Sequence, residues 1–568
     1  MNTHTQIEQK IQSAIAEKSI LGLSIAIIQA QDNAPCEVVY TNGFGTTSAE
    51  TETALPITPN TLFSLGITSR TLTTVMVLRL VEQGLLALDR PVVDYLPGYV
   101  FHDNPVWGRQ LTLQHLLTET TGLGSGGKGW GESDGGALER WAWDSYAHFR
   151  FMVAPGTVPN HGNSPTMAAY LAETVTGKHF TQLMDEQVFT PLGMTRTTYD
   201  RAVAMTRAVA LDHEQIEDGT LTVKHRFLDN LAGNPDFMGL SSAHDLANVV
   251  AMLLDKGTFA GKQILLPETV AMMTANQASY GIEHSSEVRR RMEAGEGMGC
   301  IVGEFKGVPC MGRPAVHGQA VSLDLFPGKG LGVVCLTNYS ESGKHEELVY
   351  EIYDALLETP ATYHFAEPPT PVDEGYKDLW PHHVGQYMME WGEMVKLWVA
   401  DDQLFVEYEE EPYPLVPVNT HEYYFLDGEG NRQVVTMLPE PSGATQVVVA
   451  VAYSAARVEL APDFTPDTSG WQKYVGAYLN YHDAYSTIGY YVSLHEEKLT
   501  VTGTGSDGRL RLPTAGEGDE MTQIGPNRFV CYTGLFDFTE EDGELWVQTD
   551  HAFRYRHVPD YKGSGWKI

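Results

Sequence analysis

Residues 63–84 read FSLGITSRTLTTVMVLRLVEQG, and this stretch decides the fold. From Leu72 onward it is almost unbroken apolar sequence, which predicts a helix buried around most of its circumference. Gly84 stands where a left-handed C-terminal cap would end that helix. Ile67 and Arg70 lie three residues apart at its start and should share one face. Because a helix N-terminus offers free N–H groups and a positive dipole end, we expect the chemistry of the protein here.

Residues 63–97 resemble the central helix of the serine β-lactamase and penicillin-binding protein family, in its branch of class C β-lactamases, esterases and D-aminopeptidases. That family has Phe-x-x-Gly-Ser-x-x-Lys, a long apolar helix, and then Gly-x-Leu-x-Leu-Asp-x-Pro-Val-x-x-Tyr-Leu-Pro. Residues 84–97 reproduce this tail closely. The resemblance places the nucleophilic serine of the family at Ile67 and its lysine at Arg70, so both defining residues are replaced.

Two further segments resemble family motifs and depart from them in part. Residues 111–124 are similar to the family's Leu-Leu-Thr-His-Thr-Ser-Gly-Leu segment but depart from it at Glu119, in place of the histidine, and at Thr121. Residues 155–163 are similar to Pro-Gly-x-x-x-x-Tyr-Ser-Asn, with His161 in place of the tyrosine and Asn163 retained. The framework of the family is therefore present, while residues that carry its chemistry are changed.

The third family motif, Lys/His-x-Gly on the strand that lines the site, falls at residues 317–319. His317 keeps its first position, and Gln319 replaces its closing glycine. The resemblance covers roughly residues 5–360. It implies an α/β (α+β) serine β-lactamase/transpeptidase-like domain, in which helices flank an antiparallel sheet. We expect an N-terminal helix over residues 5–19 and then a hairpin of two strands, over residues 21–29 and 37–40.

This domain is expected over residues 1–365, and a Pro-rich, acidic linker follows at 366–374. Beyond the linker, strand-like alternation dominates and a weak repeat is visible. The opening His-Val-Gly-Gln-Tyr of residues 383–387 recurs as Tyr-Val-Gly-Ala-Tyr at 474–478. We therefore expect a C-terminal all-β, lipocalin-like region built from two repeats. The two repeats are predicted over residues 375–465 and 466–568.

Composition argues against several partners. The 568 residues hold 37 Lys and Arg against 73 Asp and Glu, a formal charge of −36, which disfavours nucleic acid and anionic membranes. The sequence has no run of about 18 apolar residues, so we expect no membrane-spanning helix, and no secretory signal is visible. The five cysteines are scattered, odd in number and without metal-ligand spacing. We therefore expect free thiols in a reducing, cytoplasmic compartment, and neither a metal nor a cofactor.

The acyl-serine route of the family needs side chains that this sequence lacks. Ile67 carries no nucleophile, and Arg70 stays protonated at any accessible pH, so it cannot serve as the base. Thr68 carries a hydroxyl, but one step along a helix turns a side chain by about 100°. Ser125 and Lys128 form another Ser-x-x-Lys pair, in a Gly-rich insertion with no apolar helix behind it, which is typical of a mobile loop.

Three functions remain compatible with these motifs. In the first, the pocket performs non-covalent acid–base chemistry as a cyclase, isomerase or lyase on a small, largely apolar molecule, for example in natural-product biosynthesis. The second is a catalytically dead pseudoenzyme that binds or scaffolds. The third is a hydrolase or esterase that uses activated water. Titratable groups at the three motif positions, within an intact framework, favour the first.

For that first function, the expected catalytic residues are Arg70, His161 and His317. The guanidinium would hold an anion or a carbonyl, and the two imidazoles would exchange protons near neutral pH. The expected substrate-binding residues are Ile67, Thr68, Glu119, Asn163 and Gln319. The isoleucine would make the floor of the pocket apolar, and the asparagine would orient the substrate. A small molecule is the expected partner, and assembly into a homo-oligomer stays open.

Overall fold

The computed structural model describes residues 3–558 with internal gaps. The residues outside the description are 1–2, 32–33, 51–53, 125–133, 158, 160–163, 217–218, 225–229, 286–290, 318, 340–342, 360–373, 390–393, 409–410, 429–431, 440–444, 451–452, 459–467, 480–488, 496–497, 504–517, 532–533, 542, 550–553 and 559–568.

An antiparallel sheet forms the base of the family-like domain. Its strands follow the order β2–β1–β15–β14–β12–β11–β10–β9, and the short β13 also pairs with β14. The strands are β1 (Gly22–Gln31), β2 (Ala34–Gly45), β9 (Ala278–Ser285), β10 (Arg291–Glu296), β11 (Ile301–Phe305), β12 (Val308–Gly312), β13 (Ala315–His317), β14 (Gln319–Phe326) and β15 (Leu331–Thr337). The expected N-terminal hairpin is confirmed as β1 paired with β2.

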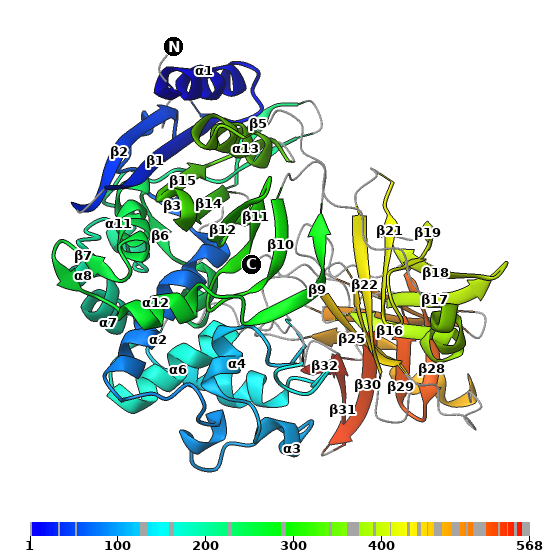
Figure 1. Ribbon diagram of the computed structural model, residues 1–568. Helices are drawn as coiled ribbons and strands as arrows, with labels where there is room; N and C mark the ends of the chain where they lie inside the picture. Colours follow the sequence, from blue (N-terminus) through cyan, green and yellow to red (C-terminus); the bar gives the residue numbers. More distant parts are fainter. Residues whose placement is uncertain are drawn as a thin grey trace.

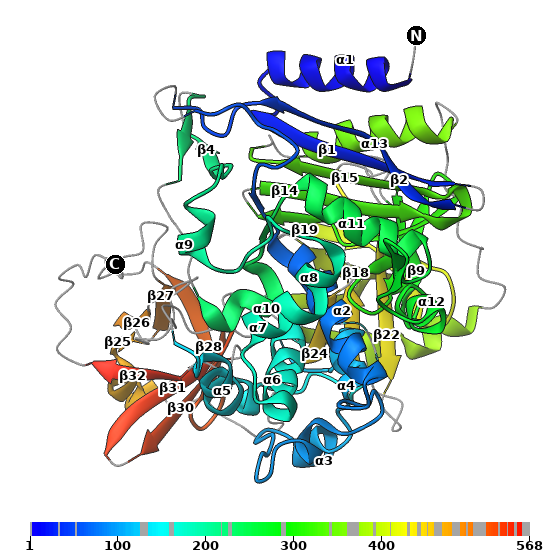
Figure 2. The same cartoon turned by 90° about the vertical axis from the view of Figure 1, so that its left-hand side faces the viewer.

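Helices pack against both faces of this sheet (Figures 1 and 2). The predicted N-terminal helix is α1 (Thr3–Ala16), which lies beside α13 (Lys344–Leu357) on one face. On the other face, α11 (Ala243–Leu254) packs against β1 and β15. The expected arrangement of an antiparallel sheet flanked by helices is therefore confirmed.

Strand β1 shows why the sheet is buried on both sides. Successive side chains of a strand point to opposite faces. Ile25 and Ile27 belong to the core beneath α1 and α13. Ala26 and Ile28 belong to the core that contains α11. Because both faces carry apolar residues, the strand reads as a continuous apolar run instead of an alternating pattern.

Helix α2 (Ser69–Glu82) runs through the centre of the domain, with eleven of its fourteen residues buried. It begins at Ser69, two residues after the expected start at Ile67, because Gly66–Thr68 form a separate 3-10 turn, η1. Its end follows the prediction, since Gly84 has a φ of 74°. No helix in the described ranges is long and apolar enough to cross a membrane.

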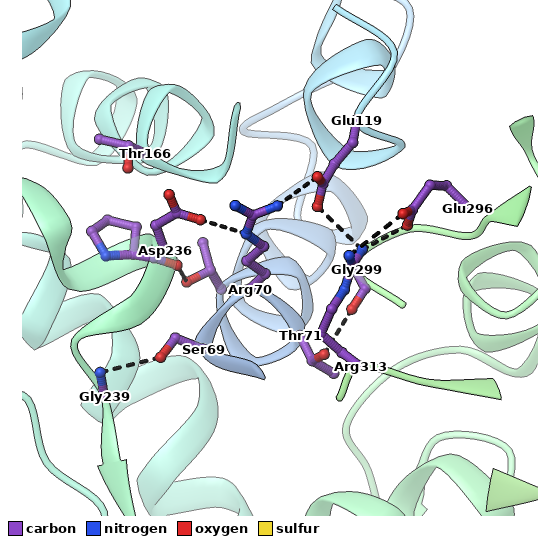
Figure 3. A network of polar contacts seen from close by, with 12 residues as sticks. Ser69, Arg70, Thr71, Glu119, Thr166, Asp236, Gly239, Glu296, Gly299 and Arg313 are labelled. Carbon is purple, nitrogen blue, oxygen red and sulfur yellow. Dashed lines mark hydrogen bonds and ion pairs between the residues drawn. The ribbon is translucent and has the colours of Figure 1, made fainter. Parts of the chain in front are cut away.

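The buried hydroxyls of α2 have backbone partners. Thr71 Oγ1 donates to the carbonyl oxygen of Gly299 at 2.7 Å, and Ser69 Oγ accepts the N–H of Gly239 at 3.1 Å (Figure 3). Thr73 Oγ1 donates to the carbonyl oxygen of Pro235 at 2.6 Å. A buried hydroxyl without a partner costs free energy. These bonds therefore fix the rotation of α2 about its axis, and with it the direction of each side chain.

A first β unit follows the linker region. Its strands are β16 (Gly385–Met389), β17 (Met394–Ala400), β18 (Gln403–Tyr408), β19 (Glu411–Pro414), β20 (Val416–Pro417), β21 (Glu422–Leu426), β22 (Arg432–Pro439), β23 (Thr445–Ala450) and β24 (Tyr453–Arg457). Arg432 of β22 pairs with Ser285 of β9, so this unit continues the sheet of the preceding domain (Figure 1).

The second β unit is a closed barrel. Its strands are β25 (Gly476–Leu479), β26 (Gly489–His495), β27 (Lys498–Gly503), β28 (Asp519–Gly525), β29 (Arg528–Cys531), β30 (Gly534–Glu541), β31 (Glu544–Thr549) and β32 (Arg554–Val558). Pairing between β25 and β32 closes it. A cluster of buried side chains that includes Tyr478, Phe529 and Phe538 packs within it. The expected all-β C-terminal region is confirmed.

The two β units share a tyrosine contact at the positions of the sequence repeat. Tyr387 donates its hydroxyl to the carbonyl oxygen of His383 at 2.7 Å, and Tyr478 makes the same bond to Tyr474 at 2.7 Å. Both donor tyrosines are fully buried. The recurring Gly-x-Tyr sequence is therefore a recurring structural element. The domain boundaries predicted after residues 365 and 465 lie outside the described residues and stay predictions.

Candidate functional site

Arg70 lies in the first turn of α2 and is enclosed by carboxylates. Its side chain is only 7% exposed. Nε binds Asp236 Oδ1 at 2.5 Å, and Nη1 binds Glu119 Oε2 at 2.5 Å (Figure 3). Asp236 comes from α10 (Asn234–Phe237), and Glu119 follows α4 (Leu113–Leu117). The guanidinium that was expected to hold a ligand is therefore bound by the protein itself on two sides.

A second arginine extends this cluster on the far side of Glu119. The guanidinium of Arg313 is fully buried, and its Nη2 lies 3.1 Å from Glu119 Oε1 and 2.6 Å from Glu296 Oε2. Two arginines and three carboxylates thus form one buried group (Figure 3). We call Arg70, Glu119, Asp236, Glu296 and Arg313 the ion-pair network.

Electrostatics keeps Arg70 charged. Burial alone would lower its pKa, because a charged group is poorly solvated in the interior. Asp236 and Glu119 outweigh that effect and raise the pKa of Arg70 above its usual value. Arg70 is therefore a fixed cation at every pH at which the protein is folded. It cannot take the role of the neutral amine that the family's lysine can supply.

Glu119 has an unusual backbone. Its φ is 53°, in the left-handed region that residues with a Cβ rarely adopt. Its side chain is buried between Arg70 and Arg313. Such a conformation costs about 1–3 kcal/mol and persists only where the surroundings impose it. The ion pairs to the two arginines supply that constraint.

Ile67 and Thr68 lie in η1, immediately before α2. Ile67 is partly buried and packs against the main core. Thr68 is fully buried, and its hydroxyl donates to the carbonyl oxygen of Arg313 at 2.7 Å. The hydroxyl of Thr68 is therefore used within the framework, and a role in substrate binding stays a prediction.

Gln319 replaces the family's motif glycine with a side chain that bonds to the backbone. Its Oε1 accepts the N–H of Ser64 at 2.7 Å, and its Nε2 donates to the carbonyl oxygen of Ala210 at 2.8 Å. The side chain is buried, so it ties β14 to two neighbouring segments. His317 stands at the end of β13, paired in register with Gln319. Binding of substrate by Gln319 stays a prediction.

Several sequence-based assignments fall outside the described residues. His161, Asn163, Ser125 and Lys128 lie in the gaps. The described residues that flank the first two are Pro159 and α6 (Ser164–Thr176). The catalytic role of His161 and the substrate-orienting role of Asn163 stay predictions, as does that of His317.

Sequence reasoning missed Asp236, Glu296 and Arg313. Asp236 is 166 residues from Arg70 along the chain, and no spacing rule connects them. Glu296 and Arg313 are 17 residues apart, on either side of the β11–β12 hairpin. The sequence offers one related signal. An arginine and a glutamate, which carry opposite charges, replace the family's lysine and histidine. That paired replacement is compatible with an ion pair between residues 70 and 119, but it does not point to Asp236, Glu296 or Arg313.

Metal-ligand groups and one cavity elsewhere in the described residues bear on where a site can lie. No group of three or more His, Cys, Asp or Glu in these ranges could hold a metal ion. A cavity of about 10 Å³ lies beside α2, lined by Thr71, Cys300 and Leu323 among others. That volume is no larger than one water molecule requires, so this cavity is not a substrate site. All five cysteines are free thiols.

Comparison with known proteins agrees with the fold and the helix–strand framework. A family model described as Beta-lactamase matches residues 7–357, which is more than half of the chain. The chain belongs to the beta-lactamase family.

Two relatives and one solved structure illustrate this. Penicillin-binding protein 4 of Amycolatopsis lactamdurans is 28% identical over 330 residues, covering 56% of this chain and 84% of the relative. Esterase EstB of Burkholderia gladioli is 30% identical over 203 residues, covering 33% and 50%. The crystal structure of SurE with D-Leu aligns with a TM-score of 0.60 at 19% identity, covering 80% of this chain and 99% of that one. At this identity the structural likeness concerns the fold.

Proposed function

We propose that this protein is a beta-lactamase-family member that forms no acyl-enzyme and performs non-covalent acid–base chemistry on a small, largely apolar molecule. Cyclisation, isomerisation and elimination are the reaction types that such a site suits. One observation carries the proposal. Ile67 occupies the position that the resemblance gives to the nucleophile, while Arg70, at the position of the base, is bound by Asp236 and Glu119.

An acyl-serine mechanism requires a hydroxyl and a group that removes its proton. The aliphatic side chain of Ile67 supplies neither group, and it makes the surroundings of the α2 N-terminus apolar. Arg70 donates hydrogen bonds but cannot accept a proton. The hydroxyl of Thr68 is buried against the carbonyl oxygen of Arg313. The groups at the start of α2 therefore suit binding of an apolar molecule better than attack on a carbonyl.

The proposal assigns proton transfer to His161 and His317, because an imidazole serves as acid and base near neutral pH without special tuning. Asn163 orients the substrate. Arg70 takes a different role from the one its position suggests. Since its Nε and Nη1 are engaged by carboxylates, it acts through the ion-pair network as a positioning residue. We further propose a reducing, cytoplasmic setting, which the five free thiols support.

A binding protein without turnover is the second candidate. The observation that favours it is the ion-pair network itself, in which the position of the family's catalytic base is taken by a buried arginine paired with carboxylates. Such a group can hold the fold without taking part in chemistry. In this case the pocket would retain a ligand and leave it unchanged.

One experiment separates the two candidates. Native mass spectrometry of the full-length protein, purified without denaturation, identifies a small molecule that stays bound. That molecule and its close isomers are then incubated with the wild-type protein and with His161→Gln. For the enzyme we expect conversion by the wild type, and a His161→Gln variant that still binds but converts only a small fraction as fast. Binding with no conversion by either protein would favour the second candidate.

A further inference from the structure

The C-terminal barrel contacts the family domain through a shared carboxylate. Asp537 Oδ2, on β30, lies 2.8 Å from Nη2 of Arg150. The same carboxylate accepts hydrogen bonds from Nε and Nη2 of Arg528 on β29, at 2.5 and 3.0 Å. The Asp537 side chain is 22% exposed and that of Arg150 is 30% exposed, so water screens this contact only in part. Figures 1 and 2 show β30 and β31 next to the helical part of the domain.

Arg150 belongs to a pair of backbone segments that runs from the barrel into the candidate site. The carbonyl oxygen of Arg150 accepts the N–H of Gly124 at 2.8 Å. The N–H of Met152 donates to Gly122 at 2.7 Å, and the N–H of Gly156 donates to Thr120 at 2.7 Å. We call the paired segments 120–124 and 150–156 the ladder.

The first segment of the ladder leads to the ion-pair network of the candidate site. It begins immediately after Glu119, which binds Arg70 and Arg313. A displacement of the ladder would therefore move Glu119, and with it the ion-pair network.

A second carboxylate anchors the ladder at the barrel end. Asp103 Oδ2 accepts the N–H of Phe151 at 2.9 Å. Asp103 also acts electrostatically on Arg528 of the barrel. Two acidic and two basic side chains thus gather where the barrel meets the ladder, and they are Asp103, Arg150, Arg528 and Asp537.

We propose that Asp537 is a positioning residue of the candidate site, through which the barrel holds the ladder by way of Arg150. The barrel is then part of the framework of the site, in addition to being a domain of its own. The proposal rests on the proposed function for the role of the ion-pair network. Its test does not, because it measures the order of the ladder and needs no substrate.

Hydrogen exchange of the full-length protein, followed by mass spectrometry, measures this order at the amides of Gly122–Gly124 and Met152–Gly156. In Arg150→Ala and in Asp537→Ala we expect exchange there to be roughly three to ten times faster than in the wild type. Arg150→Lys should recover part of the protection, since it keeps the charge. Raising the salt concentration to 1 M, where the Debye length is about 3 Å, should act in the same direction on the wild type.

Lys498→Ala is the matched control. Lys498 on β27 forms an exposed ion pair with Glu520 on β28 of the same barrel, at 2.7 Å. It should leave exchange in the ladder unchanged. Wild-type exchange of the ladder in Arg150→Ala would overturn the proposal. So would an effect in Arg150→Ala that is absent from Asp537→Ala, because Arg150 would then act within its own domain. Faster exchange confined to barrel peptides in Asp537→Ala would assign that carboxylate to Arg528 alone.

Discussion

Replacing Arg313 with methionine is expected to lower the free energy of unfolding by about 3–5 kcal/mol. The guanidinium is fully buried and lies against Glu119 and Glu296, whose side chains are at most 1% exposed. Removing it takes a positive group away from two carboxylates that water cannot reach. Urea denaturation of the wild type and Arg313→Met, followed by tryptophan fluorescence under identical conditions, measures the difference.

Lys344→Met provides the comparison, because it removes an exposed cation that binds Glu347 at 2.8 Å, three residues along α13. An exposed pair of this kind contributes at most about 1 kcal/mol. Combining Arg313→Met with Glu296→Gln should cost less than Arg313→Met alone, since the second change removes a buried charge that lost a partner. If Arg313→Met cost no more than Lys344→Met, the network would not be the stabilising unit that its burial indicates.

Restoring only the serine and the lysine of the family should not restore acylation. In an Ile67→Ser, Arg70→Lys variant, the new amine would lie between Asp236 and Glu119, which hold Arg70 at 2.5 Å on each side. Opposite charges at this distance raise the pKa of an amine and keep it protonated. A protonated lysine cannot accept the proton of the serine, so the new hydroxyl would lack a base.

Adding Glu119→His and Asp236→Asn to that variant removes both carboxylates, and the first of these returns the family's residue. We expect the variant with all four substitutions to react with a fluorophosphonate probe about 10² to 10⁴ times faster than the variant with only Ile67→Ser and Arg70→Lys. A factor of this size is the usual contribution of a general base. The rate of mass increase of the intact protein measures this, and circular dichroism reports whether each variant is folded. Equal rates in the two variants would show that the carboxylates do not control the base.

The central helix was predictable because its signal is local. The apolar run of α2 and the glycine that ends it lie within one stretch of sequence, and helix and cap occur where expected. The start of the helix was not predictable to the residue, since Gly66–Thr68 take up a 3-10 turn. The second β unit was predicted as an all-β repeat from its Gly-x-Tyr opening, which the buried bond from Tyr478 to Tyr474 explains.

The position of the candidate site was predictable from the sequence, but the ion-pair partners of its residues were not. The family resemblance marks residues 67 and 70, but the partners of Arg70 are 49 and 166 residues away in sequence. Ion pairs of such separation depend on how helices and hairpins pack, and a single sequence records only that the charges exist. The expectation that Arg70 holds a ligand stays a prediction, and the structure adds that two carboxylates of the protein bind its guanidinium.

Intact-mass measurement of the wild-type protein after exposure to a fluorophosphonate probe and to a penicillin tests the loss of the acyl-enzyme most directly. We predict an unchanged mass with both reagents, because Ile67 offers no nucleophile and Arg70 is a bound cation. A stoichiometric adduct would contradict the proposed chemistry. Peptide mapping of such an adduct to Ser125 would place the nucleophile in the Gly-rich insertion and return the protein to the acylating members of its family.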